Sequence, residues 1–494
     1  KIMYRYSALE LAKAVTLGEL TATGVTQHFF HRIEEAEGQV GAFISLCKEQ
    51  ALEQAELIDK KRSRGEPLGK LAGVPVGIKD NIHVTGLKTT CASRVLENYQ
   101  PPFDATVVER IKKEDGIILG KLNMDEFAMG STTLYSAFHP THNPWDLSRV
   151  PGGSSGGSAA AVSARFCPVA LGSDTGGSIR QPAAFCGVVG FKPSYGAVSR
   201  YGLVAFASSL DQIGPLANTV EDVALMMDVF SGRDPKDATS REFFRDSFMS
   251  KLSTEVPKVI GVPRTFLEGL RDDIRENFFS SLAIFEGEGT HLVDVELDIL
   301  SHAVSIYYIL ASAEAATNLA RFDGVRYGYR SPQAHTISQL YDLSRGEGFG
   351  KEVMRRILLG NYVLSAERQN VYYKKATAVR AKIVKAFRTA FEKCEILAMP
   401  VCSSPAFEIG EILDPVTLYL QDIYTVAMNL AYLPAIAVPS GFSKEGLPLG
   451  LQIIGQQGQD QQVCQVGYSF QEHAQIKQLF SKRYAKSVVL GGQS

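Results

Sequence analysis

The sequence predicts a layered α/β protein, because stretches with helical periodicity alternate with short apolar segments along most of its 494 residues. Hydrophobic residues make up 45% of the chain and charged residues 21%, which is the composition of a globular protein with a large core. This composition excludes an intrinsically disordered chain. We find no internal repeat and no linker long enough to separate domains, so we expect one continuous domain over residues 1–494.

Helices open the chain. Ser7 and Glu10 have the spacing of a capping box, in which each side chain satisfies a free backbone donor of the other residue. The periodicity then predicts helices over residues 23–37 and 48–64 and strands over residues 74–78 and 117–119.

Gly/Ser-rich loops alternate with apolar segments between residues 151 and 190. The pattern predicts helices over residues 156–165 and 178–185 and strands over residues 168–172 and 187–191. Further along, the sequence predicts strands over residues 258–262, 291–297, 395–399, 435–438 and 449–454, a helix over 272–285, and a mostly helical region over 302–393.

The charge and cysteine content narrow the function classes. Lys and Arg total 51 against 53 Asp and Glu, a formal net charge of −2, which argues against a chain that grips nucleic acid by itself. The seven cysteines are scattered, and none has the CxxC spacing of a zinc site, so we expect reduced thiols and no metal. No apolar run reaches the ~18 residues of a membrane span, and the first residues do not resemble a secretion signal. We therefore expect a cytoplasmic protein without membrane contact.

Two glycine-rich loops, residues 151–158 and 172–180, are the strongest candidate functional segments. Each leads into a predicted helix, so its backbone N–H groups can face one point and stabilise a negative charge. A serine in such a loop can act as a nucleophile if a base takes its proton. Neither loop has the spacing of a nucleotide-binding motif. The residues alone leave nucleophilic catalysis, anion binding and purely structural turns open.

The base is less evident from the sequence. No histidine lies in either loop, and His83, His139 and His142 stand alone elsewhere. Lys79 follows an apolar segment, and burial there would lower its pKa toward neutrality. A lysine that reaches solvent is the alternative, and spacing does not decide between them.

Taken together, these segments resemble the amidase signature family over nearly the whole chain. The resemblance rests on residues 152–158 and 174–180, with support from residues 77–81, 122–130, 208–215, 318–324 and 348–353. It implies a central mixed β-sheet covered by helices on both faces. The signature core would span about 70–220, and residues 221–494 would complete the helices and the sheet.

The resemblance also implies a Ser–cis-Ser–Lys triad. Ser178 resembles the nucleophile, Ser154 the bridging serine with a cis peptide bond, and Lys79 the terminal base. A proton would pass from Ser178 through Ser154 to Lys79, which starts neutral. The backbone N–H groups that would form the oxyanion hole belong to Thr175, Gly176 and Gly177, with Ser178 at the end of the run.

The glutamine-specific members of the family hold both charges of their substrate. By resemblance, Arg356 would bind the α-carboxylate, Asp422 the α-ammonium, and Tyr307 would lie near the substrate. An arginine fork suits a carboxylate, although the adjacent Arg355 is an equal candidate by its chemistry.

The resemblance is strongest to members that work within tRNA-dependent amidotransferases. It implies hydrolysis of the glutamine side-chain amide through an acyl-enzyme, with ammonia passed to a partner that converts Glu-tRNA(Gln), Asp-tRNA(Asn) or both. The expected partners are the B and small C subunits of such an enzyme, in a heterotrimer that contacts tRNA mainly through the partner. This chain would need no cofactor, whereas ATP and Mg²⁺ would bind the partner. The alternatives are a free-standing amidase of a small or fatty amide and a non-catalytic scaffold.

Overall fold

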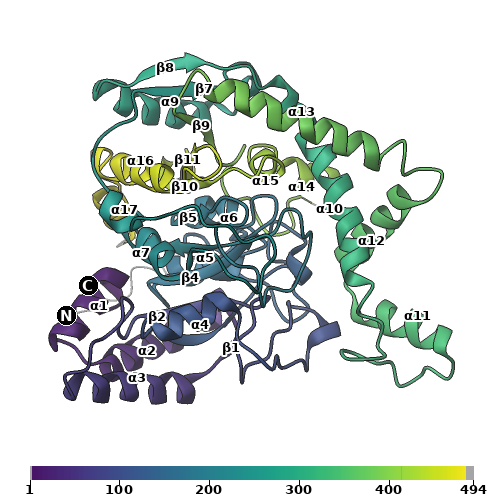
Figure 1. Ribbon diagram of the computed structural model, residues 1–494, viewed down its shortest axis with the longest axis horizontal. Helices are drawn as coiled ribbons and strands as arrows, with labels where there is room; N and C mark the ends of the chain where they lie inside the picture. The colour runs from purple at the N-terminus through teal and green to yellow at the C-terminus, as the bar shows by residue number, and fades with distance from the viewer. Residues whose placement is uncertain (1–2, 413, 485–494) are drawn as a thin grey trace.

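The computed structural model describes residues 3–412 and 414–484. Within these residues one mixed sheet of 11 strands runs through the molecule, in the order β1-β3-β2-β4-β6-β5-β10-β11-β9-β7-β8 (Figure 1). The strands are β1 Phe43–Leu46, β2 Pro75–Lys79, β3 Ile117–Leu122, β4 Val169–Asp174, β5 Val189–Lys192, β6 Gln212–Ala217, β7 Val259–Val262, β8 His291–Asp294, β9 Ile396–Pro400, β10 Ala435–Phe442 and β11 Pro448–Ile454.

Helices flank this sheet, which is the predicted α/β architecture. They are α1 Ala8–Leu17, α2 Ala22–Val40, α3 Lys48–Ser63, α4 Thr106–Lys113, α5 Gly156–Ser163, α6 Arg180–Cys186, α7 Val220–Phe230, α8 Phe248–Lys251, α9 Asp272–Gly287, α10 Ala303–Leu319, α11 Ile337–Gly348, α12 Lys351–Leu364, α13 Tyr373–Phe391, α14 Pro415–Leu420, α15 Val426–Leu430, α16 Asp460–His473 and α17 Ile476–Tyr484. Short 3₁₀ turns are η1 Met3–Arg5, η2 Arg94–Leu96, η3 Glu126–Ala128, η4 Thr265–Leu267 and η5 Asp298–His302.

The direction of the strands fixes where functional side chains meet. β2 is parallel to both β3 and β4, with Ile78 opposite Leu171, so the carboxyl ends of β2 and β4 lie side by side. Lys79 is the last residue of β2 and Asp174 the last of β4. Ligands in open α/β sheets bind at the carboxyl ends of parallel strands, and this edge carries the site described below.

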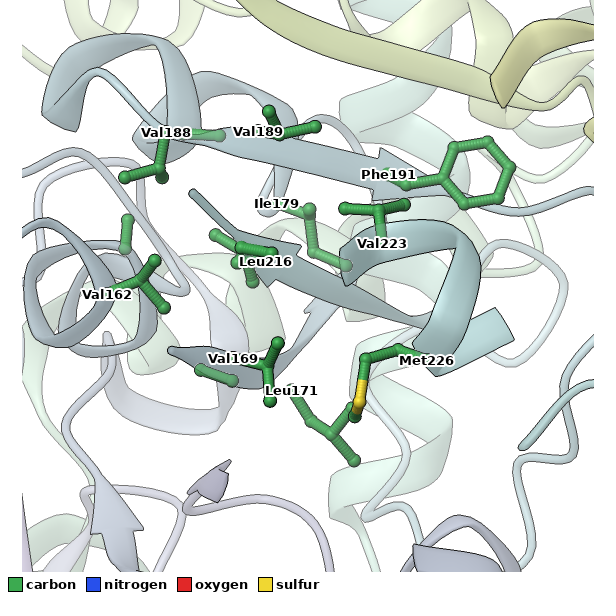
Figure 2. Close-up of a cluster of buried hydrophobic side chains, with 14 of the residues drawn as sticks. Val162, Val169, Leu171, Ile179, Val188, Val189, Phe191, Leu216, Val223 and Met226 are labelled. Carbon is green, nitrogen blue, oxygen red and sulfur yellow. The ribbon is translucent and has the colours of Figure 1, made fainter. Parts of the chain in front are cut away.

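An apolar cluster packs beneath the glycine-rich loops, among the strands and helices that flank them. Figure 2 shows side chains of β4, β5 and β6 packed together with those of α5 and α7. Ile179, directly after the predicted nucleophile, is fully buried in this cluster. The labelled members are Val162, Val169, Leu171, Ile179, Val188, Val189, Phe191, Leu216, Val223 and Met226. Close packing of this kind holds the backbone of the following loop in one position.

Helices α10 to α13 form the side of the molecule to the right in Figure 1. Gly360 of α12 lets this helix approach α10 closely, because a Cβ at that position would lie 2.0 Å from the carbonyl oxygen of Ser312. The helical region predicted over 302–393 is confirmed, although residues 320–336 between α10 and α11 form no helix. α10 and α12 together carry the predicted substrate-binding tyrosine and arginine.

Most predicted elements are confirmed within one to four residues. Ser7 and Glu10 form the capping box at the start of α1. Two strands that the sequence pattern did not reveal are β1 and β6, and β6 contains Pro215. The predicted strand over 291–297 ends at Asp294.

One helical stretch among the described residues, Asp298–Leu319, is long and apolar enough by composition to cross a membrane. No continuous apolar run was visible in the sequence there, because Ser, Thr and Glu interrupt it. Of its most apolar window, 67% is buried inside the protein, where α10 packs against α12 and α13. A buried core helix passes the same test of length and composition.

Candidate active site

Lys79 lies at the centre of a ring of hydroxyl groups. Its side chain is fully buried, so the alternative of a lysine that reaches solvent does not apply. Its Nζ lies 2.7 Å from Ser154 Oγ, 2.8 Å from Ser155 Oγ and 2.9 Å from Ser173 Oγ. Burial lowers the pKa of Lys79 to about 7, although three carboxylates in the vicinity oppose this shift. An amine in this state can accept a proton near neutral pH.

The first glycine-rich loop presents Ser154 to this lysine. The peptide bond between Gly153 and Ser154 is cis. The loop is held from two sides: the Gly153 N–H donates to Gln181 Oε1 at 2.9 Å, and the Ser154 carbonyl accepts from the Asp125 N–H at 3.3 Å. A Cβ on Gly153 would lie 2.1 Å from Asp125 Oδ2, so only glycine fits there.

The second loop is organised by the carboxylate of Asp174. It accepts hydrogen bonds from the N–H groups of Gly177 and Ile179, from the guanidinium of Arg180 and from the amide of Asn429. Arg180 and Asp174 are both fully buried. Burial alone would raise the pKa of Asp174, but the charge and hydrogen bonds of Arg180 outweigh it and hold this pKa well below its ordinary value. A permanently ionised carboxylate therefore fixes the turn that carries Ser178.

Ser178 is 9% exposed at the mouth of this turn. Its carbonyl accepts from the Ser155 N–H at 3.1 Å, which ties the two glycine-rich loops together. Within the described residues, no side-chain hydrogen bond joins Ser178 to Ser154. The structure thus records the Lys79–Ser154 contact directly and links Ser178 to the serine pair through the backbone. Catalytic hydrogen bonds are often long before substrate binds.

The predicted oxyanion donors differ in their availability. The N–H of Gly177 donates to Asp174 Oδ1 at 2.8 Å. Gly177 therefore differs from the expectation that its N–H is free to bind the oxyanion. In the described part of the chain, the N–H groups of Thr175, Gly176 and Ser178 donate to no protein acceptor. The sequence could not reveal this difference, since it depends on which N–H groups the Asp174 carboxylate takes.

Arg356 and Arg355 have distinct environments. Arg356 is 3% exposed, and its Nε donates to Glu352 Oε1 at 2.9 Å. Its guanidinium lies over the ring of Tyr308, 4.9 Å from the centroid. Across the described residues its two Nη groups contact no acceptor. Arg355 pairs with the other oxygen of Glu352, and its side chain is 44% exposed. The buried arginine with an open fork is therefore Arg356.

Burial lowers the pKa of Arg356, but Tyr308 and Glu352 raise it well above its ordinary value, so the guanidinium stays charged. Asp422 also contacts Tyr308, whose hydroxyl donates to Asp422 Oδ2 at 3.1 Å. Burial raises the pKa of Asp422 to about 7, which that hydrogen bond and the Arg356 charge oppose. Tyr308 thus contacts both a fixed positive charge and a titratable carboxyl.

Tyr307 and the segment that follows Asp422 both contact the nucleophile loop at Gly176. A Cβ on Gly176 would lie 2.5 Å from Cζ of Tyr307, so the Tyr307 ring lies directly against this loop. Thr425, three residues after Asp422, donates from Oγ1 to the Gly176 carbonyl at 2.7 Å. Tyr307 and Asp422 therefore come from segments in contact with the loop that carries Ser178, and Arg356 lies on α12, which packs on α10.

Sequence reasoning missed several residues of this site. Ser155 and Ser173 share Lys79 with Ser154, Tyr308 bonds Asp422, and Glu352 orients Arg356. Ser155, Ser173 and Glu352 all lie in or beside segments that carried the family resemblance, which was the available signal. Among the described residues, no group of three or more His, Cys, Asp or Glu side chains is placed to hold a metal ion, and the seven cysteines are buried and unpaired.

Comparison with known proteins places this geometry in a family. Residues 24–464 match the amidase family. The chain belongs to the amidase family. A Ser–cis-Ser–Lys triad is characteristic of its members, and this chain is an enzyme of that family.

Several curated relatives of this amidase are named as the A subunit of glutamyl-tRNA(Gln) amidotransferase. The protein of that name from Chlamydia felis is 77% identical over 477 residues, covering 97% of both chains. The one from Protochlamydia amoebophila is 52% identical over 467 residues, covering 94% of this chain and 96% of its own. A crystal structure of the Thermotoga maritima protein of the same name has a TM-score of 0.79 at 42% identity, with 95% of each chain covered.

Proposed function

We propose that this amidase is the glutaminase subunit of a tRNA-dependent amidotransferase. The observation that carries the proposal is the buried Lys79 amine, 2.7 Å from Ser154 Oγ and next to the loop that bears Ser178. The high identity to proteins named as such subunits supports it independently.

The proposed reaction begins with neutral Lys79. Ser178 loses its proton to Ser154 as Ser154 gives its own proton to Lys79, and Ser178 Oγ attacks the side-chain carbonyl carbon of glutamine. The oxyanion is stabilised by backbone N–H groups that include those of Thr175 and Gly176. The proton returns along the same path to the amide nitrogen, the C–N bond breaks and ammonia leaves. Water then attacks the γ-glutamyl ester, which releases glutamate and restores the Ser178 hydroxyl.

The proposed substrate contacts follow from charge. The open fork of Arg356 would take the α-carboxylate in two parallel hydrogen bonds, and ionised Asp422 would take the α-ammonium. Tyr307 and Tyr308 would line the space between them. Arg356 is favoured over Arg355 for this role, because the Arg355 side chain is 44% exposed and pairs with Glu352.

The alternative of a free-standing amidase for a small or fatty amide is disfavoured by these charges. An apolar amide would leave the Nη groups of the buried Arg356 and the carboxyl of Asp422 without the substrate partners that glutamine supplies. A non-catalytic scaffold would not need the buried lysine and its ring of hydroxyls.

The proposed partners follow from the tRNA-dependent reaction. Ammonia would pass to a B subunit, in a heterotrimer with a small C subunit, where ATP and Mg²⁺ activate the tRNA-linked carboxylate. This chain would need no cofactor and would contact tRNA mainly through the partner, in the cytoplasm. Whether the product is Gln-tRNA(Gln), Asn-tRNA(Asn) or both would be set by the partner.

Glutamine-dependent ammonia release tests the proposal. Ser178→Ala is expected to abolish release, while Ser163→Ala, which removes a buried hydroxyl without a hydrogen-bond partner among the described residues, should leave it unchanged. The wild-type chain, alone and with its proposed partners and tRNA, should hydrolyse glutamine far better than butyramide, which lacks both α-substituents. Wild-type release by Ser178→Ala, or a preference for butyramide, would overturn the proposal.

A further inference from the structure

Two segments that carried the family resemblance contain no proposed catalytic or substrate-binding residue, and they contact each other. One is residues 122–130 and the other is residues 348–353, more than 200 positions later. The carboxylate of Glu126 accepts from the Gly350 N–H at 2.7 Å and from the Ser93 hydroxyl at 2.6 Å. The neighbouring rings of Phe127 and Phe349 also meet, with centroids 5.7 Å apart.

Gly350 is the N-cap residue of α12, and no side chain of its own caps this helix. Glu126 supplies the acceptor instead, from a side chain that is 2% exposed. A carboxylate at a helix N-terminus satisfies a free N–H group and complements the positive end of the helix dipole. A Cβ on Gly350 would lie 2.4 Å from Glu126 Oε2, so the two groups are in tight contact.

Asp125, the residue before Glu126, contacts the loop that carries Ser154. The Asp125 N–H donates to the Ser154 carbonyl at 3.3 Å, and the Asp125 carboxylate accepts from the N–H groups of Thr132 and Thr133. Consecutive residues 125 and 126 therefore bind the serine loop on one side and the start of α12 on the other. Arg356 lies six residues into that helix from Gly350, about 9 Å along its axis.

We infer that Glu126 is a positioning residue that fixes α12, and with it Arg356, at the correct distance from the catalytic serines. The inference rests on the function proposed above, because it assumes that Arg356 binds the α-carboxylate of glutamine. Glu126 itself does not touch the substrate.

A second contact, on α10, limits how far α10 and α12 can move. On α10, Glu314 accepts from the N–H and hydroxyl of Ser209, and α10 packs closely on α12. Loss of Glu126 should therefore displace the first turns of α12 without detaching the helix. The effect should fall on recognition of the α-carboxylate and spare the chemistry at Ser178.

The test measures kinetics on two substrates with the full chain in its proposed complex. Glutamine carries the α-carboxylate, and γ-aminobutyramide is the same molecule without it. For Glu126→Ala, KM for glutamine should rise about tenfold, the size expected for a lost buried hydrogen bond, with kcat nearly unchanged. The kcat/KM for γ-aminobutyramide should match the wild type.

Further variants keep the test informative if Glu126→Ala folds poorly. Glu126→Gln retains a carbonyl oxygen for the Gly350 N–H and should restore most of the wild-type KM. Gly350→Ala places a methyl group against the Glu126 carboxylate and so disturbs the same contact. It should raise KM for glutamine selectively. The matched control is Asp222→Asn: Asp222 is also buried and accepts from the N–H groups of Ala8 and Leu9 at the start of α1, but α1 carries no predicted site residue. It should lower stability and leave KM unchanged.

The outcomes separate this inference from the proposed function. If Arg356→Lys removes the preference for glutamine over γ-aminobutyramide but Glu126→Ala and Gly350→Ala do not weaken it, the role of Glu126 is wrong and the proposed function stands. If the Glu126 variant slows both substrates equally, Glu126 supports the serine loop and the inference also fails. If Arg356→Lys leaves the preference intact, the arginine assignment fails, and the inference fails with it.

Discussion

Lys79 Nζ lies 2.7 Å from Ser154 Oγ, in a position where the lysine is fully buried and no carboxylate of the described residues forms an ion pair with it. The described carboxylates that influence its pKa, which include Asp125 and Asp174, are bonded elsewhere, to backbone N–H groups and to Arg180. Burial therefore prevails over attraction, and the amine becomes a base at neutral pH.

This relationship predicts the pH dependence of catalysis. Lys79 must be neutral to accept a proton, and its pKa is about 7. The kcat/KM should rise with pH, about tenfold per unit below pH 7, and level off above it. Butyramide is the substrate of choice for the measurement, because it has no α-ammonium and its profile does not report on Asp422. A rate independent of pH between 5.5 and about 8.5 would contradict Lys79 as the base.

Asp422 predicts a second pH effect, on substrate binding. Its ionised form would bind the α-ammonium, and burial raises its pKa to about 7. KM for glutamine should therefore fall as pH rises through 7, whereas KM for glutaramate, which lacks the ammonium, should not show this fall. Asp422→Asn should abolish the difference between the two profiles and raise KM for glutamine by about ten- to a hundredfold. An unchanged KM in Asp422→Asn would rule out this contact.

The arginine assignment gives a matched pair of variants. Arg356→Lys removes a planar fork with open Nη groups and should raise KM for glutamine about tenfold or more, because lysine cannot bind a carboxylate in two parallel bonds. Arg355→Lys keeps a positive charge beside Glu352 at a half-exposed position and should leave KM within about twofold. The reverse pattern in steady-state kinetics would show that Arg355 is the ligand.

The fold was largely visible in the sequence where apolar segments were continuous. Residues 74–78 were predicted as a strand because every side chain there is small or apolar, and β2 lies at Pro75–Lys79. β6 was not visible, because Gly214 and Pro215 are adjacent and separate Ile213 from Leu216, whereas in residues 74–78 a Val or Ile stands on both sides of each Pro or Gly. It is nevertheless fully buried between β4 and β5, so tertiary pairing outweighs its weak local preference.

The site was visible only as far as its motifs extend. Lys79, Ser154 and Ser178 lie in recognisable segments, and the structure brings Lys79 and Ser154 into contact. The bond from Tyr308 to Asp422 could not be predicted from the sequence, because adjacent helical residues point about 100° apart and both tyrosines are buried here. Only the packing of α10 decides which hydroxyl meets Asp422.

Arg180 predicts a large effect on stability. Arg180→Met would leave Asp174 buried and unpaired, which should lower the free energy of unfolding by about 3–5 kcal/mol. Arg264→Met, which breaks a half-exposed ion pair with Asp294, should cost less than about 1 kcal/mol. Urea unfolding measures both values.

The sign of the pH effect follows from Asp174. The pKa of Asp174 is depressed in the folded wild type. Its contribution to stability is therefore present above its ordinary pKa of about 3.9 and is lost as pH falls through its pKa in the folded state. In Arg180→Met the folded pKa of Asp174 would be raised, so this variant should lose stability as pH rises. The difference in the free energy of unfolding between wild type and variant should therefore narrow as pH falls toward 4. A difference independent of pH would contradict this account of Asp174.

The contact between Gly176 and Tyr307 predicts that the oxyanion loop tolerates no added atom. Gly176→Ala would place a methyl group 2.5 Å from Cζ of Tyr307, so the loop must move and its N–H groups with it. Losing one oxyanion donor typically lowers kcat by about a hundred- to a thousandfold, and we expect a loss of this order. Gly38 lies on α2 with open space around it, so Gly38→Ala should leave kcat unchanged. Combining Gly176→Ala with Tyr307→Leu removes the obstructing ring, so the double variant should have a higher kcat than Gly176→Ala alone. If the two losses simply multiply, the ring does not hold the loop, and Gly176 acts without Tyr307.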